Sequence, residues 1–395
     1  MTKNDDKCII FGKELKGEGH KVNTYRNRIP AYLILADGTI YNGWNLGAQG
    51  TTIGEVVFTT GMTGYQETLT DPSYYGQIVT QTFPLIGNYG VNDKDKESSK
   101  VWLSGYIIRE WCFQPSNFRS EGDLGEYLTK AGIVGIYDID TRALTRKIRE
   151  AGVMNGAITT DFPEDFHAFL DRIRKFSIVD AVETVSYKDP MSFRVDDPVC
   201  KVVLMDYGYK KNILRSLNGR GCDVYVMPHD TTLEQIKKID PDGIMLSNGP
   251  GDPTDNPVVI KNLRQILDET SLPILGICLG HQLMALAYGG QTEKLKYGHR
   301  GANQPVYDTN KNRVFVTTQN HGYAVLGDSI APSVGKVSHY NANDHSCEGI
   351  IYTRPDTFTV QFHPEACAGP HDTQYLFDNF VSNMVRYRQE KNKFK

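Results

Sequence analysis

The sequence predicts an α/β protein with two domains: a mixed α+β amino-terminal domain followed by a doubly wound α/β domain. Three observations support this fold class. The chain has 395 residues, against roughly 100–200 for a typical domain. Apolar residues make up 39% of it, which is enough for packed cores and excludes a disordered chain. The pattern of strands and helices also changes in the middle of the chain, across a polar stretch that contains Asp189-Pro190.

These observations place the expected boundaries. We expect a polar extension over residues 1–28, the amino-terminal domain over 29–184, a linker over 185–199 and the second domain over 200–395. The extension mixes acidic with basic residues and has no long apolar segment. We therefore expect neither a secretory signal nor an organellar transit peptide there.

The elements of the first half are irregularly spaced. Strands are expected at residues 31–36, 39–41, 55–60, 77–82 and 101–108, the first two joined by the turn Asp37-Gly38. Helices are expected at 124–131 and 143–149, the second preceded by a capping candidate at Asp140-Thr141. Strands and helices without regular alternation indicate a mixed α+β domain.

In the second half, short apolar runs alternate with helical segments. Strands are expected at residues 202–205, 223–227, 243–246 and 273–277, with helices at 212–217, 233–239 and 258–267. This alternation predicts right-handed βαβ units and a largely parallel sheet. The later runs at 314–317, 349–352 and 358–362 have no helices between them, so we expect an antiparallel edge there. A helix at 373–387 ends the domain.

Composition excludes several classes of protein. The formal net charge is −4, whereas a dedicated nucleic-acid binder normally has a basic excess. The most apolar window, residues 271–290, contains His281, Gln282 and several glycines, so no membrane span is expected. The seven cysteines are odd in number and form no C-x-x-C pair. They indicate a reducing compartment rather than a disulfide framework or a zinc site.

The segment Gly276–Gln282 contains the strongest candidate for a catalytic residue. A buried strand runs into Cys278 and a helical stretch begins directly after it, with Gly276 and Gly280 on either side. This pattern is typical of a nucleophile elbow, a sharp turn that exposes the side chain at its tip. Because a helix amino terminus favours negative charge, we expect it to lower the pKa of the Cys278 thiol. The alternative is a buried structural cysteine, which is the interpretation we give to the other six.

A thiol nucleophile needs a base and a group that orients the base. His363 and Glu365 are two residues apart at the end of an expected strand, so they share a face. Glu365 is thus placed to bind one imidazole nitrogen while the other faces the thiol. His321 is the rival candidate for the base, and His281 is expected to be structural.

A hydrolytic site also has to hold an oxyanion. The amide of Leu279 is one candidate donor, and the loop Ser247–Pro253 offers a second. Pro250 has no N–H, so Gly249 or Gly251 must donate. The chain contains no phosphate-binding loop and no H-E-x-x-H zinc motif.

Together these segments carry a family resemblance. The second half resembles the triad-type (class I) glutamine amidotransferases at Ser247–Pro253, Gly276–Gln282 and His363–Glu365. The first half resembles the amino-terminal domain of carbamoyl-phosphate synthetase small chains, which other amidotransferases lack, at Gly54–Glu67, Thr70–Tyr74, Pro84–Gly90 and Asp138–Arg142. The resemblance spans about residues 31–388.

The resemblance implies roles for individual residues. Cys278 is expected to attack the carboxamide of glutamine, with His363 moving the proton and Glu365 orienting His363. Gly251 and Leu279 are expected to hold the oxyanion. The implied glutamine-binding residues are Ser73, Gly249, Gly251, Leu279, Gln282, Asn320, Gly322 and Tyr323. Ser73 belongs to the first domain, so the pocket is expected at the domain interface.

The family also implies a partner. The chain is expected to be a cytoplasmic glutaminase subunit that passes ammonia to a large chain in a heterodimer. That large chain makes carbamoyl phosphate from bicarbonate and ATP for arginine and pyrimidine synthesis. We expect no cofactor and no metal on this chain, since ATP and a divalent metal belong to the large chain.

Three alternatives remain at this level. One is the amidotransferase subunit of another synthetase, for anthranilate or GMP, which would not need the first domain. A second is a cysteine hydrolase on the same fold, which would not need Ser73, Gln282 and Asn320. A third is a non-catalytic regulatory subunit, which would not need a complete Cys–His–Glu set.

Overall fold

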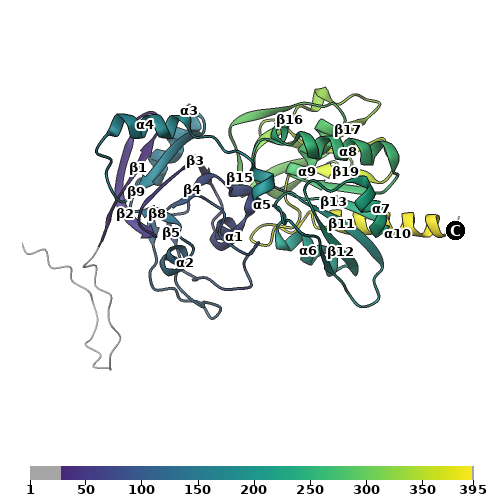
Figure 1. The fold of residues 1–395 in the computed structure, drawn as a ribbon, viewed down its shortest axis with the longest axis horizontal. Coiled ribbons are helices and arrows are strands. Elements are labelled where there is room, and N and C mark those ends of the chain that lie inside the picture. The colour runs from purple at the N-terminus through teal and green to yellow at the C-terminus, as the bar shows by residue number, and fades with distance from the viewer. Residues whose placement is uncertain (1–27, 394–395) are drawn as a thin grey trace, which may run out of the picture.

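The structure, a computed structural model, describes residues 28–393. The expected polar extension therefore lies outside the described residues, except for Arg28. Two bodies lie next to each other (Figure 1). The first is drawn in purple to teal and the second in green to yellow, with the strand labelled β15 between them.

The first body is built around a closed barrel of seven strands in the order β1-β2-β8-β6-β4-β3-β9. These strands are β1 Pro30–Leu35, β2 Ile40–Gly47, β3 Thr51–Thr59, β4 Gln77–Gln81, β6 Gly105–Ile107, β8 Val134–Tyr137 and β9 Met154–Thr159. The short strands β5 Leu85–Ile86 and β7 Glu110–Trp111 pair beside it. Its helices are α1 Tyr65–Thr70, α2 Leu124–Lys130, α3 Thr141–Ala151 and α4 Phe166–Lys175. The next helix, α5 Ala181–Val185, packs against the second body, because Val182 belongs to a core of that body.

The barrel mixes both kinds of strand pairing, which confirms the mixed α+β prediction. β3, β4, β6 and β8 pair with one another in parallel. Every pair that involves β1, β2 or β9 is antiparallel, and these pairs close the ring. The expected cap of α3 is present, because the Asp140 side chain accepts a hydrogen bond from the Ala143 amide at 2.9 Å. The strand expected at 101–108 is shorter, since only Gly105–Ile107 joins the barrel.

The second body contains a sheet of ten strands in the order β10-β12-β11-β13-β14-β19-β18-β16-β15-β17. The strands are β10 Met191–Phe193, β11 Cys200–Asp206, β12 Cys222–Pro228, β13 Gly243–Leu246, β14 Ile274–Ile277, β15 Thr292–Asp308, β16 Arg313–Val325, β17 Gly335–Asn341, β18 Cys347–Tyr352 and β19 Thr357–Val360. The helices are α6 Lys211–Asn218, α7 Leu233–Ile239, α8 Pro257–Glu269, α9 Leu279–Ala287 and α10 Tyr375–Lys393. Single 3₁₀ turns form at η1 Pro72–Tyr74 in the first body and at η2 Pro253–Asp255 and η3 Gly327–Ser329 in the second.

Helices cover both faces of this sheet, as expected for a doubly wound domain. Successive residues of a strand face opposite sides. Val203 and Met205 of β11 accordingly pack in a core with residues of α7, α8 and α9. Val202 and Leu204 pack in a second core with residues of α6 and α10. The two cores hold the parallel strands rigidly, so the loops that follow these strands have fixed origins.

Two features of the second body differ from expectation. β19 was expected in the antiparallel edge, but it pairs in parallel with β14, with Ile277 opposite Val360. The antiparallel edge begins only at β18. In addition, the expected linker 185–199 contains strand β10, which pairs with β12. β10 is only three residues long and the residues on either side of it are polar, so the whole segment resembles a loop in composition. Across residues 28–393, no helix is both long and apolar enough to cross a membrane.

Candidate active site

The candidate residues of the second body follow three neighbouring parallel strands. Ser247–Gly251 comes after β13, Cys278 after β14 and the run to Glu365 after β19. These strands are adjacent in the sheet, so their carboxyl ends share one edge. The amide of Cys278 donates a hydrogen bond to Val360 O at 2.9 Å, which extends the pairing beyond the strand ends. Ligands of open α/β sheets bind at such an edge.

Cys278 has the backbone geometry of a nucleophile elbow. Its φ of 53° and ψ of −104° are unfavourable for a residue with a side chain. The residue directly precedes α9, and its thiol donates a long hydrogen bond to Asn320 O, at 3.7 Å. The flanking glycines explain how the turn closes. A Cβ on Gly280 would lie 2.4 Å from Leu246 O, and one on Gly276 would lie 2.9 Å from Gly280 O. Strand and helix therefore approach closely only because both residues are glycine.

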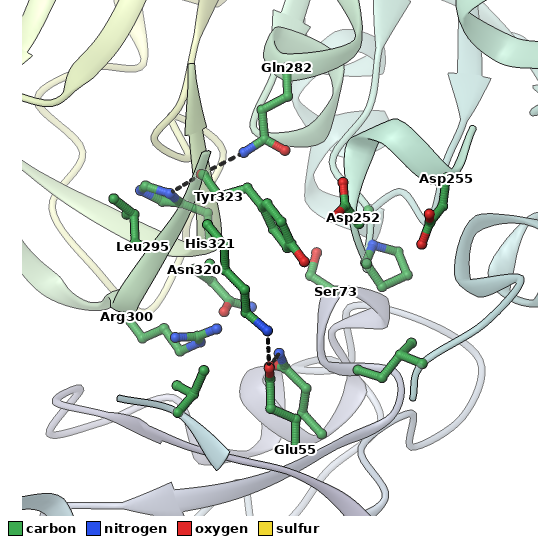
Figure 2. A pocket seen from close by; sticks show the side chains of 18 of the residues that line it. Glu55, Ser73, Asp252, Asp255, Gln282, Leu295, Arg300, Asn320, His321 and Tyr323 are labelled. Carbon is green, nitrogen blue, oxygen red and sulfur yellow. Dashed lines mark hydrogen bonds and ion pairs between the residues drawn. The ribbon is translucent and has the colours of Figure 1, made fainter. Parts of the chain in front are cut away.

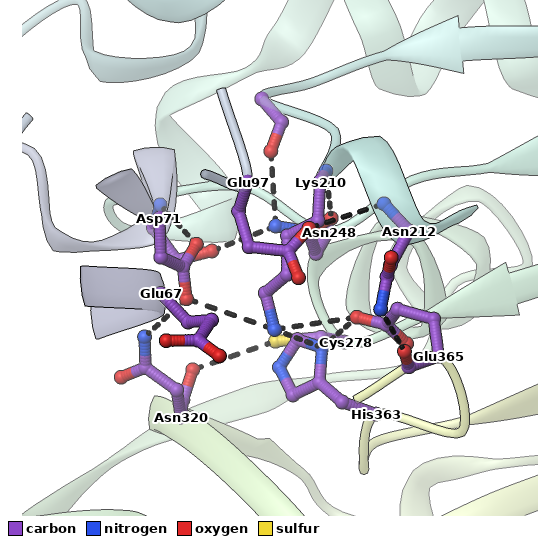
Figure 3. Close-up of polar contacts among 12 residues, drawn as sticks. Glu67, Asp71, Glu97, Lys210, Asn212, Asn248, Cys278, Asn320, His363 and Glu365 are labelled. Atoms are coloured by element: carbon purple, nitrogen blue, oxygen red, sulfur yellow. Dashed lines mark hydrogen bonds and ion pairs between the residues drawn. The ribbon is translucent and has the colours of Figure 1, made fainter. Parts of the chain in front are cut away.

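His363 and Glu365 form a buried pair behind Cys278. His363 Nδ1 lies 2.7 Å from Glu365 Oε1, and both side chains are fully buried. The other ring nitrogen, His363 Nε2, is buried and has no hydrogen-bond partner. Figure 3 shows the imidazole next to the Cys278 sulfur. The carboxylate thus fixes one ring nitrogen and leaves the other free on the side of the thiol.

Lys210 belongs to the same cluster, although it is not among the residues expected from the sequence. Its Nζ lies 3.1 Å from His363 Nδ1, 3.2 Å from Glu365 Oε1 and 3.7 Å from Asp71 Oδ2. Burial acts to lower the pKa of Lys210, but Asp71, Glu365 and Glu97 raise it well above its usual range. A signal was present in the sequence, because Lys210 follows β11, another parallel strand that ends at the same edge.

The surroundings set the charges of the cluster. Burial acts to raise the pKa of Glu365, but His363 and Lys210 outweigh it and lower that pKa to about 2. Glu365 is therefore ionised at neutral pH. For Cys278, the expected lowering is wrong: burial raises the pKa of the thiol to about 12, although Lys210 and the Leu279 amide act against it. The helix terminus is itself buried here, and the nearby carboxylates of Asp71 and Glu365 also disfavour a thiolate.

A cavity of about 340 Å³ opens in front of Cys278, between the two bodies (Figure 2). This volume is within the usual range for small-molecule sites. Of the expected glutamine-binding residues, Leu279 alone does not line the cavity, and its side chain is buried. The other expected residues all line it: Ser73, Gly249, Gly251, Gln282, Asn320, Gly322 and Tyr323.

The first body contributes to the cavity through the segment around η1. Asn248 Nδ2 donates to Ser73 Oγ at 2.9 Å, and Asn320 Nδ2 donates to Asp71 Oδ2 at 3.1 Å. These contacts join the loop after β13 and strand β16 to the first body. Thr60 adds a further contact, since its amide donates to Arg300 O at 3.2 Å. Ser73 therefore sits at the domain interface, as expected.

Of the other two histidines named from the sequence, His321 has both ring nitrogens hydrogen-bonded and His281 has one. His321 lines the cavity, with Nδ1 2.8 Å from Tyr323 O and Nε2 3.1 Å from Gln319 Oε1. It has no free nitrogen for a thiol, unlike His363. His281 lies on α9, and its Nδ1 is 2.7 Å from Thr359 Oγ1. Burial lowers the pKa of His281 to about 3, which agrees with a neutral structural role.

One buried group within residues 28–393 has ligand atoms close enough to hold a metal: His299, His321 and Glu348. Its members already have protein partners. His299 Nε2 lies 2.8 Å from Asp344 Oδ2, and its Nδ1 lies 3.4 Å from Glu348 Oε1. Burial acts to lower the pKa of His299, but the two carboxylates raise it. A ligating imidazole must be neutral at the coordinating nitrogen, so this group fits an internal ion pair better than a metal site.

The doubly wound sheet, the cysteine elbow and the buried His–Glu pair define a class of protein. A sequence profile described as "Glutamine amidotransferase class-I" matches residues 203–383. The second body is therefore a class I glutamine amidotransferase domain.

The first body identifies the family within this class. A profile described as "Carbamoyl-phosphate synthase small chain, CPSase domain" matches residues 33–158. Proteins named carbamoyl phosphate synthase small chain are similar over nearly their whole length. The one from Symbiobacterium thermophilum is 47% identical over 89% of this chain and 98% of its own. Those from Fusobacterium nucleatum and Bacillus anthracis are 50% and 49% identical, over 89% and 91% of this chain and 97% of theirs. The chain belongs to the carbamoyl phosphate synthase small-chain family.

Proposed function

We propose that Cys278, His363 and Glu365 carry out the glutamine hydrolysis by which this small chain supplies ammonia to a large synthetase chain. One observation carries the assignment of roles. His363 Nε2 is buried without a partner on the side of Cys278, while Glu365 holds Nδ1 at 2.7 Å. This nitrogen is therefore available to take a proton, as a general base requires. In the proposed reaction it takes the proton that Cys278 gives up.

The proposed reaction begins with the neutral thiol. Cys278 Sγ attacks the carboxamide carbon of glutamine as its proton moves to His363 Nε2. Glu365 stabilises the resulting imidazolium. The imidazolium then gives the proton to the leaving nitrogen, the C–N bond breaks and ammonia departs, which leaves a γ-glutamyl thioester. Water, deprotonated by His363, hydrolyses the thioester to glutamate and restores the thiol.

Backbone amides stabilise the oxyanion in this proposal. The Leu279 amide faces the Cys278 sulfur and acts on its pKa, so it is close to the attacked carbon. Gly251 lines the cavity, and its φ of 87° suits a glycine. We assign these two amides to the oxyanion, and the glutamine-binding role to the other lining residues, namely Ser73, Gly249, Gln282, Asn320, Gly322 and Tyr323.

Ammonia needs a route that bound glutamine does not block. A second cavity, of about 80 Å³, lies beyond the site and is lined by Asp71, Lys210 and Asn320. Asn320 also lines the glutamine cavity, so the two spaces adjoin. The far side of the smaller cavity is formed by Gly61, Thr63, Gly64 and Ala366–Ala368. We assign the exit of ammonia to this side and the docking of the large chain to the surface around it. Met62, whose side chain is 70% exposed, supports this docking surface.

The remaining assignments concern the complex as a whole. ATP and the divalent metal belong to the large chain in this proposal. In support, the chain lacks a phosphate-binding loop motif, and its reaction needs only a thiol, a base and backbone amides. The cytoplasm is the proposed compartment, since the mechanism requires a reduced Cys278. The cysteines within residues 28–393 are all free, in agreement with a reducing environment.

The test replaces the nucleophile. Cys278→Ala is expected to abolish carbamoyl phosphate synthesis from glutamine in the complex and to leave synthesis from ammonium unchanged. Cys112→Ala, which removes a half-buried cysteine of the first body, is the control and should leave both activities intact. Equal loss of both activities in Cys278→Ala would show that the cysteine is structural.

A further inference from the structure

Arg300 is a buried cation in the glutamine cavity that no carboxylate neutralises. Its side chain lines the cavity and the residue is only 4% exposed. Within residues 28–393, the guanidinium forms no ion pair. Burying a charge without a partner is expensive. We therefore expect an anionic group of a ligand to bind this guanidinium.

Its hydrogen bonds are also incomplete. NH1 donates to Tyr297 O at 2.6 Å, whereas Nε is buried without a partner. A guanidinium has five N–H donors in a fixed fork, so most of them remain available. Burial lowers the pKa of Arg300 below its ordinary value. Since arginine remains charged in proteins even then, the cavity holds an unsatisfied positive charge.

The strand pairing places Arg300 beside a residue already assigned to the site. Arg300 of β15 pairs directly with Asn320 of β16, and opposite residues project on the same face. Two glycines make room for the guanidinium. A Cβ on Gly298 would lie 2.6 Å from NH1, and one on Gly322 would lie 3.2 Å from NH2. Figure 2 shows the Arg300 side chain extending toward the cavity next to Asn320.

The other cation of the cavity is already paired. Lys294 Nζ lies 2.7 Å from Glu55 Oε1. Glu55 is held in turn by Gln77, whose Nε2 donates to Oε2 at 3.0 Å. The cation that remains for an anionic group of the substrate is therefore Arg300. At neutral pH, the anionic group of glutamine is its α-carboxylate.

We propose that Arg300 binds the α-carboxylate of glutamine and thereby selects an α-amino acid amide over other small amides. This inference rests on the glutaminase function proposed above. A guanidinium and a carboxylate match as a two-pronged pair of hydrogen bonds, which also fixes the direction of the substrate. With the carboxylate held at Arg300, the carboxamide end points away toward Cys278, inside the same cavity.

The experiment compares two amides in the small chain bound to its large chain. L-Glutamine carries the α-carboxylate, and 4-aminobutanamide is glutamine without it. In Arg300→Gln, the KM for glutamine is expected to rise roughly 10- to 100-fold, the range for a lost charged hydrogen bond, with a smaller effect on kcat. Competitive inhibition by 4-aminobutanamide should change less than about threefold, since this compound offers no carboxylate to lose. Arg300→Lys keeps the charge without the fork and should give an intermediate KM.

Controls separate this role from others. Arg313→Gln removes an exposed arginine of β16 and should leave every constant unchanged. An unchanged KM for glutamine in Arg300→Gln, or equal weakening of both amides, would overturn the proposal. Should Arg300→Gln fail to fold, Arg300→Lys decides by the same comparison. Failure of the proposed function looks different: the wild type would not hydrolyse glutamine, or Cys278→Ala would hydrolyse it equally fast.

Discussion

Two buried histidines flank the nucleophile, and their hydrogen bonds separate their roles. His321 uses both ring nitrogens within its own strand, bonding to Tyr323 O and Gln319. His363 uses only Nδ1. A general base must have a nitrogen free to take a proton. His321 therefore shapes the wall of the cavity, and His363 is the group able to move a proton.

This difference predicts distinct kinetic defects. His363→Asn is expected to lower kcat for glutamine by about 10²–10⁴-fold, the usual contribution of a positioned base. His321→Asn should mainly raise KM. Glu365→Gln should lower kcat less than His363→Asn does, because Glu365 orients the base without transferring the proton. Steady-state kinetics of the complex measure all three. An inactive His321→Asn beside an active His363→Asn would show that the base is misassigned.

A second prediction at this scale concerns the thiol of Cys278. Because burial raises its pKa to about 12, the thiol is protonated at neutral pH and only a small fraction is thiolate. Below the pKa that fraction grows about tenfold per pH unit. The rate of Cys278 alkylation by iodoacetamide in the free chain should therefore keep rising about tenfold per pH unit from about pH 7 to pH 10. Peptide mass spectrometry follows the modification site by site. A plateau below about pH 8 would indicate a thiol of lowered pKa, and a rate that levels off between about pH 9 and pH 10 would indicate a thiol of ordinary pKa.

The site residues that can be predicted from the sequence are those that belong to a short local motif. Cys278, with its two glycines, and the pair His363 and Glu365 are short-range patterns. Lys210 and Arg300 are different, because each acquires its surroundings from strands distant in sequence. Burial of a lysine or an arginine is rare, and no local motif indicates it for either residue. The same limit applies to the thiol pKa, which depends on how deeply the helix terminus lies within the fold.

At the scale of elements, the turn between β14 and α9 is the most constrained structure near the site. Gly280→Ala is expected to disrupt it, because the added Cβ would lie 2.4 Å from the Leu246 backbone oxygen. Overpacking of this kind typically costs about 1–3 kcal/mol. Glutaminase activity should fall and the thermal midpoint should decrease. The matched control is Gly122→Ala, where the nearest atom to the new Cβ is Val91 Cγ2 at 3.6 Å.

Calorimetry and glutaminase assays test the pair of variants together. Wild-type stability and activity in Gly280→Ala would mean that strand and helix separate easily, contrary to the close approach seen here. Loss in both variants would point to a general sensitivity of the chain to added methyl groups. The expected result is loss in Gly280→Ala alone.

The strands and helices of the parallel sheet are predicted well from the sequence, and the antiparallel strands beside it are predicted less well. α7 and β13 match the expected ranges, since buried strands and amphipathic helices have distinct apolar patterns. The long hairpin of β15 and β16 is largely missed. Its strands are interrupted by register shifts, at Lys294/His299 and Gly301/Gln304. Such bulges break the alternation of apolar and polar residues. They also lie where Arg300 and Asn320 enter the cavity. The same bulges that make the hairpin hard to predict from the sequence therefore occur where it contributes residues to the site.

At the scale of the whole molecule, the site is built from both bodies of this chain. Its activity is expected to depend also on the large chain. Ammonia released without a partner would be protonated in water and lost as a nucleophile. The free chain is therefore expected to hydrolyse glutamine slowly, with an increase of about an order of magnitude or more on addition of the large chain, ATP and bicarbonate. Deletion of residues 1–28 should leave this stimulation unchanged.

The surface around Met62 offers a specific test of this dependence. Met62→Asp places a charge on the proposed docking surface and should weaken the stimulation. Val258→Asp, on the exposed side of α8, is the control because Val258 is 56% exposed in the second body. Titration with the large chain measures both variants. A free chain already at full rate, or full stimulation of Met62→Asp, would remove the proposed docking role of this surface.

The hydrogen bond between Asn248 and Ser73 has a consequence for how the chain can be altered by recombination. A class I domain from another synthetase would bring its own nucleophile, base and sheet, and would fold as a unit. It would nevertheless meet the barrel without the side chains that complement Asp71 and Ser73. The hydrogen bonds that join the first-body wall of the pocket to the catalytic domain would then be missing from a fusion that joined two intact domains. A functional exchange of domains in this family therefore has to include the segment around η1 together with the catalytic domain. The part of the chain that is needed for activity thus extends across the boundary between the two domains.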